Sequence, residues 1–297
     1  MTKQTDDTQN TQNVQGAQDA QDAHDARTVL VTSATGKTGR RVAERLAARG
    51  LTVRAGARRG PTPFDWEDPE TWAAALRGAD SAYVAYYPDL AAPGAVEAME
   101  TFGRLAVEGG VRRITLLSGR GEPEAAVAEE ALRNAAEGVE LAVVRAAFFA
   151  QNFSEGLLAE GVAAGTLVFP AGDTREPFID ADDLADVVVE TLTDDAHAGR
   201  AHDLTGPRAV DFAEVAAEIS RASGRPVVYE PVSGEAYAEL LTGFGIPAPE
   251  AEWVAALFAS LLDGHNSSVT DGVERVLGRE PRSFTRYADG VWGGSGT

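Results

Sequence analysis

The sequence predicts an α/β fold in which a doubly wound parallel sheet carries a small C-terminal α/β lobe. Three observations predict this fold. Short apolar runs alternate with segments of helical period along most of the chain, which is typical of strands joined by helical crossovers. A glycine-bearing turn joins the first apolar run to the first helical segment. The 297 residues, 44% of them hydrophobic, are sufficient for one large domain with an appended lobe.

The regular part of the chain follows a polar tail. Residues 1–26 are rich in Gln, Asp, Thr and Ala, with almost no large apolar side chains. Burial cannot offset the ordering entropy of such a segment, so we expect a disordered, acidic and polar tail. The tail has no apolar signal-peptide core and the chain has no transmembrane run, so we expect a cytoplasmic protein.

Five apolar runs are predicted as strands, and helical segments separate them. The predicted strands are 28–33, 51–57, 81–87, 112–118 and 140–146. The predicted helices are the segment with Val42 and Leu46 on one face, then 68–79, 94–110 and 122–137. Because two parallel strands need a long crossover between them, this order places helices on both faces of the sheet.

The second half of the chain is less regular. The stretch 177–192 is predicted as a short strand and a helix, with Asp182 as the N-cap and Asp183 in the first turn. A helix at 211–224 and a strand at 226–233 follow. We expect the helical pieces of 234–285 to form a small lobe over the carboxyl ends of the strands, where open α/β sheets bind ligands.

The turn in "TVLVTSATGKTGRRVAERLAARG" predicts a Rossmann-type dinucleotide site. The amides and the dipole of the following helix are suited to hold a diphosphate. Gly36 lets the main chain approach the phosphates, and Gly39 lets the helix pack on the strand. Ser33 stands where such turns often have glycine, and it is strained if its φ is positive. The predicted contacts are Ser33, Thr35, Gly36, Lys37, Thr38 and Gly39.

The end of the second predicted strand indicates which dinucleotide is bound. NAD sites commonly place an acid there, whereas this chain has Arg58 and Arg59. Guanidinium groups grip a 2′-phosphate, and Lys37 adds a further positive charge. We therefore predict NADP(H) as the cofactor and 27–150 as an NADP-binding Rossmann domain, with 151–297 completing the sheet and forming the substrate lobe. The alternative for the basic residues is a solvated basic face.

Composition excludes several classes of partner and site. A formal net charge of −20 argues against binding to nucleic acid or to anionic membranes. Cysteine is absent and the four histidines show no ligand spacing, so we expect no metal site. The expected partner is a small aromatic molecule, and the chain is expected to be a monomer or a homodimer.

Five motifs taken in order resemble the NmrA-like group of atypical short-chain dehydrogenase/reductases. They are the turn with its following strand, "DWEDPETWAAALRGADSAYVAYYP", "VRRITLLSG", "LAVVRAAFFAQNF" and "FIDADDLADVV". The resemblance implies an NAD(P)-binding domain with a C-terminal substrate lobe, and it adds Asn152 to the cofactor contacts. The family includes NADPH-dependent quinone and dye reductases, aromatic ether reductases, and regulators that bind the dinucleotide without turnover. The chain departs from the family at Ser33 and at Arg145-Ala146-Ala147, where relatives often have Arg-Pro-Gly.

No tyrosine of the chain has a lysine four residues later, because lysine is absent after Lys37. A phenol activated by such a lysine is therefore not available. Hydride transfer to an electron-poor acceptor needs positioning and donors for the developing oxyanion. The candidates at strand ends are Tyr86, Tyr87 and Ser118; the alternatives are packing for the tyrosines and a turn role for the serine.

Aromatic residues are predicted to line a substrate pocket suited to a flat ligand. The candidates are Phe148, Phe149, Phe153 and Trp253, together with Phe244 and Phe258; core packing is the alternative for most of them. Glu129 and Glu130 match an acidic family position, and a solvated helix face also explains them. The leading hypothesis is an NADPH-dependent oxidoreductase of a quinone-like or conjugated aromatic molecule, in secondary metabolism. The alternatives are a non-catalytic redox sensor and a tailoring protein that couples or rearranges aromatic intermediates.

Overall fold

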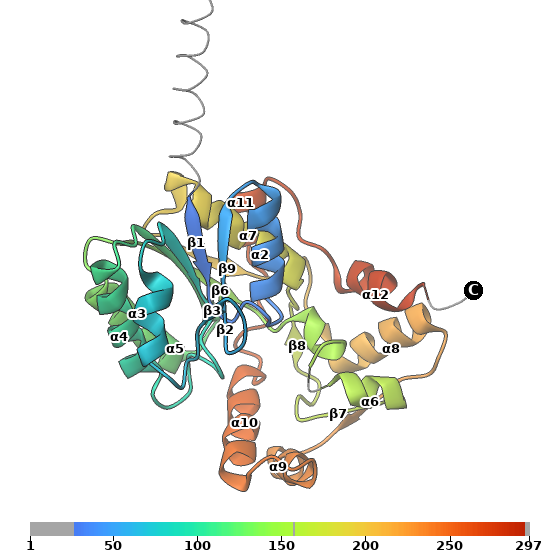
Figure 1. Cartoon of the computed structure of the whole chain (residues 1–297). Coiled ribbons are helices and arrows are strands. Elements are labelled where there is room, and N and C mark those ends of the chain that lie inside the picture. Colours follow the sequence, from blue (N-terminus) through green and yellow to red (C-terminus); the bar gives the residue numbers. More distant parts are fainter. Residues whose placement is uncertain (1–26, 157, 295–297) are drawn as a thin grey trace, which may run out of the picture.

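A seven-stranded parallel sheet forms the centre of the computed structural model, which describes residues 27–156 and 158–294 (Figure 1). The strand order is β3-β2-β1-β4-β5-β6-β9, so the direction of winding reverses between β1 and β4. The predicted tail, 1–26, lies outside the described residues. The strands are β1 (Thr28–Val31), β2 (Thr52–Ala57), β3 (Thr62–Pro63), β4 (Ser81–Val84), β5 (Arg113–Gly119), β6 (Glu140–Ala146) and β9 (Ala201–Leu204). The α/β, doubly wound prediction is confirmed.

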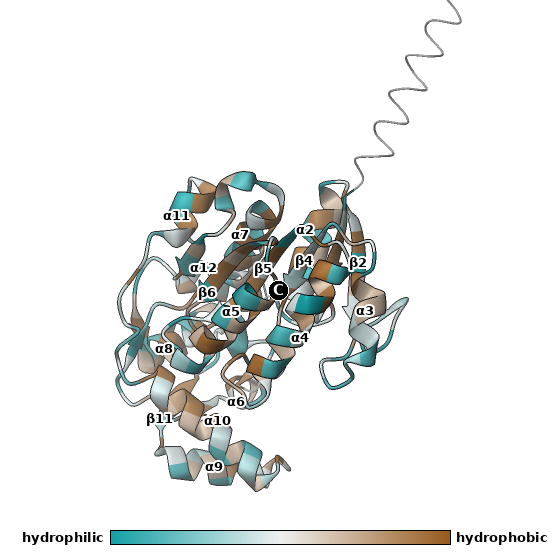
Figure 2. Ribbon diagram, turned by 90° about the vertical axis from the view of Figure 1, so that its left-hand side faces the viewer, coloured by the Kyte–Doolittle hydropathy of each residue, from teal (hydrophilic) through white to brown (hydrophobic). Residues whose placement is uncertain are grey.

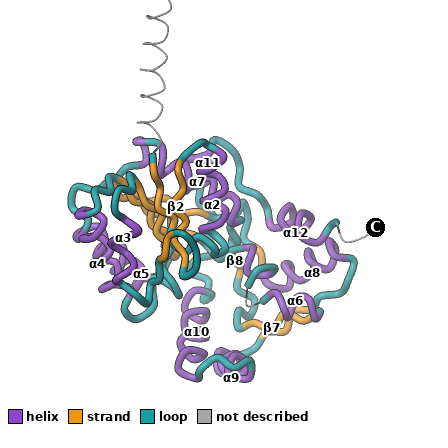
Figure 3. The backbone as a smooth tube through the Cα atoms, in the orientation of Figure 1, coloured by secondary structure: helices purple, strands orange, loops and turns teal. Residues whose placement is uncertain are grey.

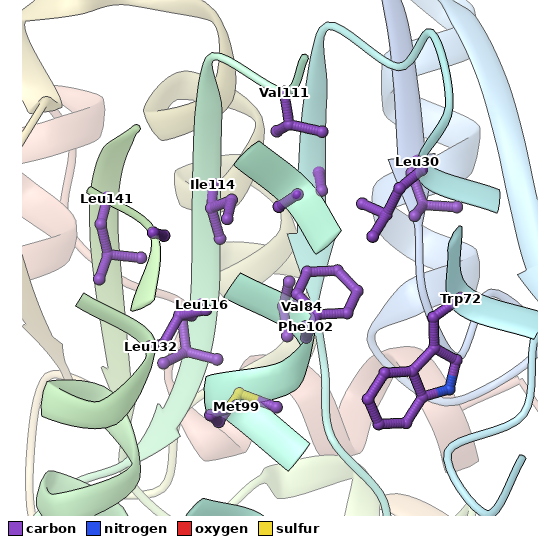
Figure 4. Close-up of a cluster of buried hydrophobic side chains, with 14 of the residues drawn as sticks. Leu30, Trp72, Val84, Met99, Phe102, Val111, Ile114, Leu116, Leu132 and Leu141 are labelled. Atoms are coloured by element: carbon purple, nitrogen blue, oxygen red, sulfur yellow. The ribbon is translucent and has the colours of Figure 1, made fainter. Parts of the chain in front are cut away.

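Helices cover both faces of the sheet. One face carries α3 (Glu70–Leu76), α4 (Ala95–Glu108) and α5 (Pro123–Ala135), and the other carries α2 (Gly39–Ala48), α7 (Ala181–Thr193) and α11 (Gly272–Leu277). Successive side chains of a strand point to opposite faces, so Leu30 packs in the first layer while Val29 and Val31 pack in the second. Figure 4 shows Leu30 and Val84 in the same cluster as Phe102 of α4.

The chain between β6 and α7 and the chain after β9 build the lobe. Its elements are η1 (Ala150–Phe153), α6 (Ala159–Ala164), β7 (Thr166–Phe169), β8 (Arg175–Glu176), β10 (Val210–Asp211), α8 (Phe212–Ser223), β11 (Val228–Pro231), α9 (Gly234–Gly243), α10 (Ala248–Leu261) and α12 (Phe284–Trp292). A short helix, η2 (Asp195–His197), precedes β9. Two small sheets, β7–β11 and β8–β10, stand beside a phenylalanine-rich core. Hydrophobic residues concentrate in the central sheet and on the helix faces that cover it (Figure 2).

The predicted N-cap of α7 is wrong by two residues. Asp180 caps the helix, because its carboxylate accepts the N–H of Asp182 at 2.8 Å, and Asp182 and Asp183 occupy the first turn. No strand forms at 177–180; a single bridge joins Ile179 to Phe149. That bridge holds the backbone extended up to Asp180, so the helix begins there.

Loops fill the space between the sheet and the lobe (Figure 3). Several of them leave the carboxyl ends of the central strands, and α10 approaches the same region. None of the described helices is both long enough and apolar enough to cross a membrane.

Candidate functional site

A cavity of about 520 Å³ lies at the carboxyl ends of β1, β4, β5 and β6. Its walls come mainly from the loops after these four strands and from the last turns of α10, with Glu176 of β8 and Asn266 completing them. It includes the point between β1 and β4 where the sheet changes its direction of winding, which is where open α/β sheets bind ligands. Its size is within the range of small-molecule sites.

The glycine turn forms one wall of this cavity. Ser33 adopts φ 48°, and it is the non-glycine residue with positive φ in the described part of the chain. The strain that the sequence analysis attached to this serine is therefore present. The Ser33 hydroxyl donates to the Ala85 carbonyl at 2.8 Å, and the Ala34 N–H donates to the Gly56 carbonyl at 3.0 Å. The turn is thus held against the ends of β4 and β2.

The two glycines of the turn are required by close backbone contacts. A Cβ on Gly39 would lie 2.3 Å from the Ser33 carbonyl oxygen, and one on Gly36 would lie 3.0 Å from the same oxygen. A side chain at Gly39 would therefore push α2 away from β1. A Cβ on Gly36 would meet the Ser33 carbonyl of the turn before it reached a bound phosphate, so the backbone already requires this glycine.

The start of α2 presents free N–H groups to the cavity. Among the described residues, the amides of Lys37, Thr38 and Gly39 donate no hydrogen bond, and Gly36, Lys37 and Thr38 line the cavity. Free amides at a helix N-terminus, together with the helix dipole, favour an anion such as a diphosphate. Thr35 is exposed and does not line this cavity.

Lys37 and Asn152, both predicted as cofactor contacts, meet in the cavity. The Lys37 ammonium donates to Asn152 Oδ1 and lies 6.0 Å from the centre of the Phe149 ring. Burial lowers the pKa of Lys37 to about 8, while the nearby Glu155 carboxylate acts in the opposite direction. Lys37 is thus engaged on the lobe side of the turn.

Arg58 and Arg59 follow directly after β2 and are exposed. Neither side chain makes a hydrogen bond or an ion pair within the described residues, and neither lines the cavity. Their place is next to the turn, because the Gly56 carbonyl two residues earlier accepts the Ala34 N–H. No described contact joins the pair to Lys37, so the three basic side chains do not form one cluster.

Ser118 belongs to a buried polar network at the end of β5. Its hydroxyl donates to Glu129 Oε1 at 2.6 Å, and Glu129, only 4% exposed, forms an ion pair with Arg145 at 2.6 Å. The structure thus corrects the turn role for Ser118 and the solvated-face explanation for Glu129, because α5 directs Glu129 inward. Glu130 is exposed and lies 3.5 Å from Arg133.

The two candidate tyrosines line the cavity after β4. Tyr86 is half-buried, and its ring packs edge-on against Trp66 with centroids 5.0 Å apart. Burial and then the nearby Glu97 and Glu67 carboxylates raise the pKa of Tyr86. Tyr87 is 60% exposed and stands at the rim.

Only part of the predicted aromatic set lies on the cavity wall, so a substrate pocket of these residues stays a prediction. Phe148 and Phe149 line the cavity, and so does Phe258 of α10. Phe153 is 0% exposed and packs in the lobe core, with its ring 5.4 Å from that of Phe178. Trp253, on an earlier turn of α10, does not line the cavity. An aromatic side chain can serve either a pocket wall or a core, so the sequence alone did not separate the two.

Four carboxyl groups on the cavity walls were not predicted: Asp89, Glu122, Glu155 and Glu176. Partial burial acts to raise the pKa of Glu155, but its hydrogen bonds from Arg41 and Arg40 lower it overall. Burial raises the pKa of the other three, to about 8 for Glu122 and to about 7 for Glu176. Asp89 and Glu122 contact each other, which raises the pKa of Glu122 further. Asp89 and Glu122 follow the ends of β4 and β5, a signal that the sequence contained, whereas no local pattern marks Glu176. The described residues hold no cluster of three metal-ligating side chains.

The comparisons with known proteins agree with this architecture. The sequence model of the NmrA-like family matches residues 126–288. The NAD(P)H azoreductase of Xenophilus azovorans is 32% identical over 254 residues, 83% of this chain and 84% of the azoreductase. The prestalk A differentiation protein A of Dictyostelium discoideum is 28% identical over 76% of this chain and 75% of its own length. The agroclavine dehydrogenase of Claviceps fusiformis is 29% identical over 77% of this chain and 83% of its own.

Two solved structures show the same fold. The triphenylmethane reductase of Citrobacter sp., complexed with NADP(H), superposes with a TM-score of 0.68 at 22% identity, over 90% of this chain and 99% of its own. The NADPH-dependent quinone oxidoreductase QOR2 of Escherichia coli, complexed with NADPH, gives a TM-score of 0.70 at 20% identity, over 89% and 99%. The Rossmann-type prediction is confirmed by these likenesses.

Proposed function

The chain belongs to the NmrA-like family, and on that premise we propose that it is an NADPH-dependent reductase of small conjugated aromatic molecules. One observation carries the proposal. The anion-binding start of α2 and an apolar wall that includes Phe148, Phe149 and Phe258 face the same cavity. Relatives named as an azoreductase, a quinone oxidoreductase and a triphenylmethane reductase support the reaction and the aromatic class of substrate.

The residues present fit a dinucleotide. The free amides of Lys37, Thr38 and Gly39 bind the diphosphate. The absence of a side chain at Gly39 keeps the start of α2, and with it these amides, close to β1. Arg58 and Arg59, exposed beside the turn and without partners among the described residues, take the 2′-phosphate. When bound, the reduced nicotinamide supplies the hydride.

The remaining cavity residues orient the substrate and shield it from water. The ring faces of Phe148 and Phe258 hold a flat acceptor by stacking, and α10 closes the lobe side of the cavity. The hydroxyls of Tyr86 and Tyr87 are placed to donate to an oxygen or nitrogen on which negative charge develops. Ser118 acts as a positioning residue, because its proton is held by Glu129.

We place this reductase in secondary metabolism, since one relative is named as an agroclavine dehydrogenase. A relative named as a differentiation protein and the lack of a Tyr-x-x-x-Lys pair favour a second candidate, a sensor that binds NADP(H) without turnover. Both candidates share the binding site and differ in the chemistry.

One experiment separates them. The dissociation constants of NADPH and NADH are measured for the wild type, Arg58→Ala, Arg59→Ala and, as an exposed control, Arg77→Ala. Quinones, azo dyes and triphenylmethane dyes are then added, and loss of the reduced cofactor is followed by absorbance. We expect the wild type to prefer NADPH and to oxidise it with at least one acceptor.

The arginine variants test the cofactor selectivity of the same site. Removal of either guanidinium is expected to weaken NADPH binding by about 1.5–3 kcal/mol and to leave NADH binding and the control unchanged. An equal loss for both cofactors contradicts the 2′-phosphate contact. Tight NADPH binding with no oxidation by any acceptor supports the sensor.

A further inference from the structure

Glu176 places a buried carboxyl group in the wall of the cavity. The residue ends β8 and is 3% exposed, yet it lines the cavity together with Phe148 and Phe258. A carboxyl group this deeply buried is costly unless it is paired or holds a proton. No ion pair to Glu176 exists among the described residues, whereas many other carboxylates of the chain are paired with arginine.

Only one of the two Glu176 oxygens is used within the described residues. Oε1 accepts the N–H of Phe148 at 3.2 Å. Oε2 has no hydrogen-bond partner there. It is also not one of the unpartnered polar atoms that are fully buried, so its accessible surface faces the cavity that Glu176 lines. Because Phe148 comes two residues after β6, the carboxyl is anchored directly beside the carboxyl ends of the central strands.

The charged groups that face Glu176 are committed to other partners. Arg120, at the end of β5, donates to the Asn266 carbonyl at 2.7 Å and to the Ser268 hydroxyl at 2.6 Å. His265 is held by Asp263 and by the Gly121 carbonyl. On the neighbouring strand β10, Asp211 lies 3.5 Å from Arg175.

Burial and the neighbouring donors act on the pKa of Glu176 in opposite directions and leave it near neutral pH. Burial raises the pKa of Glu176 to about 7, although the Phe148 N–H, Arg120 and His265 all act to lower it. Both forms of the carboxyl are therefore populated near pH 7, which suits a group that gives up and regains a proton in each turnover.

The other acids of the cavity are less suited to this task. Glu155 is ion-paired with Arg40 and Arg41. Asp89 and Glu122 face each other, so a proton on that pair is shared between two carboxyls. The pKa of Tyr86 is raised above its already high ordinary value, and the Lys37 ammonium is engaged by Asn152. Glu176 combines deep burial, a fixed position and an open oxygen.

Resting on the reductase function proposed above, we propose that Glu176 is the proton donor to the substrate. As the conjugated acceptor receives a hydride from the reduced nicotinamide, an electron pair moves to its terminal oxygen or nitrogen. The Glu176 O–H bond breaks and a new bond from that proton to the terminal atom forms. The cofactor is left oxidised, the acceptor has gained two electrons and two hydrogens, and the Glu176 carboxylate regains a proton from solvent.

The test compares Glu176→Gln with the wild type and with Glu130→Gln, a matched change of an exposed carboxyl. The glutamine keeps the oxygen that accepts from Phe148 but has no acidic proton. The protonated acid is the active form, so wild-type kcat/KM is expected to be constant below pH 7 and to fall as the pH rises above about 7. In Glu176→Gln we expect kcat to fall about 100-fold or more and this alkaline decline to disappear, with NADPH affinity and thermal midpoint unchanged.

Two further measurements decide the assignment. An infrared pH titration without cofactor is expected to show a protonated carboxyl band that disappears near pH 7 in the wild type and is missing in Glu176→Gln. An active wild type whose rate and pH profile survive in Glu176→Gln overturns the proton donor while the reductase function stands. An alkaline decline that persists in Glu176→Gln but disappears in Glu122→Gln overturns it as well, in favour of the Asp89–Glu122 pair. A wild type that turns over no acceptor overturns the reductase function and this role together.

Discussion

Ser33 shows how one residue satisfies a turn that favours glycine. Its positive φ costs about 1 kcal/mol for a residue with a Cβ, and its hydroxyl compensates through the hydrogen bond to the Ala85 carbonyl. The side chain therefore fastens the cofactor turn to the end of β4, which a glycine does not do.

A pair of substitutions at Ser33 separates the strain from the hydrogen bond. Ser33→Ala keeps the strain and loses the bond, so we expect it to lower the free energy of unfolding by about 1 kcal/mol. Ser33→Gly loses the bond and the strain together, and we expect a change of less than about 0.5 kcal/mol. Urea denaturation measures both values. An alanine variant as stable as the glycine variant contradicts this account.

At the scale of elements, α7 joins the turn helix to the C-terminal segment. Asp183 is fully buried and pairs with Arg279 and Arg282, which come almost a hundred residues later. On the same helix, Asp182 pairs with Arg41 and Arg45 of α2 but is partly exposed. The segment between α11 and α12 is thus tied to the Rossmann part of the molecule by a buried carboxylate.

The two neighbouring aspartates of α7 make a matched test of burial. Asp183→Ala leaves two guanidinium groups without a buried partner, and we expect a loss of about 3 kcal/mol in the free energy of unfolding. Asp182→Ala removes a partly exposed pair and is expected to cost less than about 1 kcal/mol. Denaturant titration at neutral pH compares them, and equal losses would show that burial of the Asp183 carboxylate is not decisive.

At the scale of the whole molecule, the cavity exists only because the lobe returns over the sheet. The turn and the strand ends supply much of its polar surface, while α10 supplies Leu257, Phe258 and Leu261, and the residue after it, Leu262, adds a further leucine. The Phe258 ring lies 5.9 Å from that of Phe148 and 4.9 Å from that of Phe169. On the proposed function, the lobe therefore shapes the acceptor side of the site, and the turn holds the cofactor.

Removal of the Phe258 ring tests this division of roles. We expect Phe258→Ala to raise the KM for an aromatic acceptor on the order of 10-fold, which corresponds to about 1.4 kcal/mol of lost stacking and burial. The NADPH dissociation constant is expected to stay within about 2-fold. Trp253→Ala, on the same helix but away from the cavity wall, is the control. A cofactor affinity that falls with the ring contradicts the division.

The sequence by itself determined the parts of this protein that depend on neighbours along the chain. The alternation of apolar runs and helical segments predicted β1, β2, β4, β5 and β6 but not the two-residue β3, and the spacing of Ser33, Gly36 and Gly39 predicted the turn. Backbone dihedral preference and side-chain periodicity are local properties, so the sequence alone is sufficient to predict them. The short strand β9 was missed because four residues at the edge of the sheet carry too little pattern.

Only the tertiary structure decided which side chains face the cavity and what charge they hold. Phe149 and Phe153 are only four residues apart in the sequence, yet Phe149 lines the cavity and Phe153 is buried in the lobe core. Lys37 and Asn152 are 115 residues apart and meet in the cavity, and Glu176 owes its raised pKa to segments distant in sequence. Burial and desolvation are set by long-range packing, so no local pattern contains them.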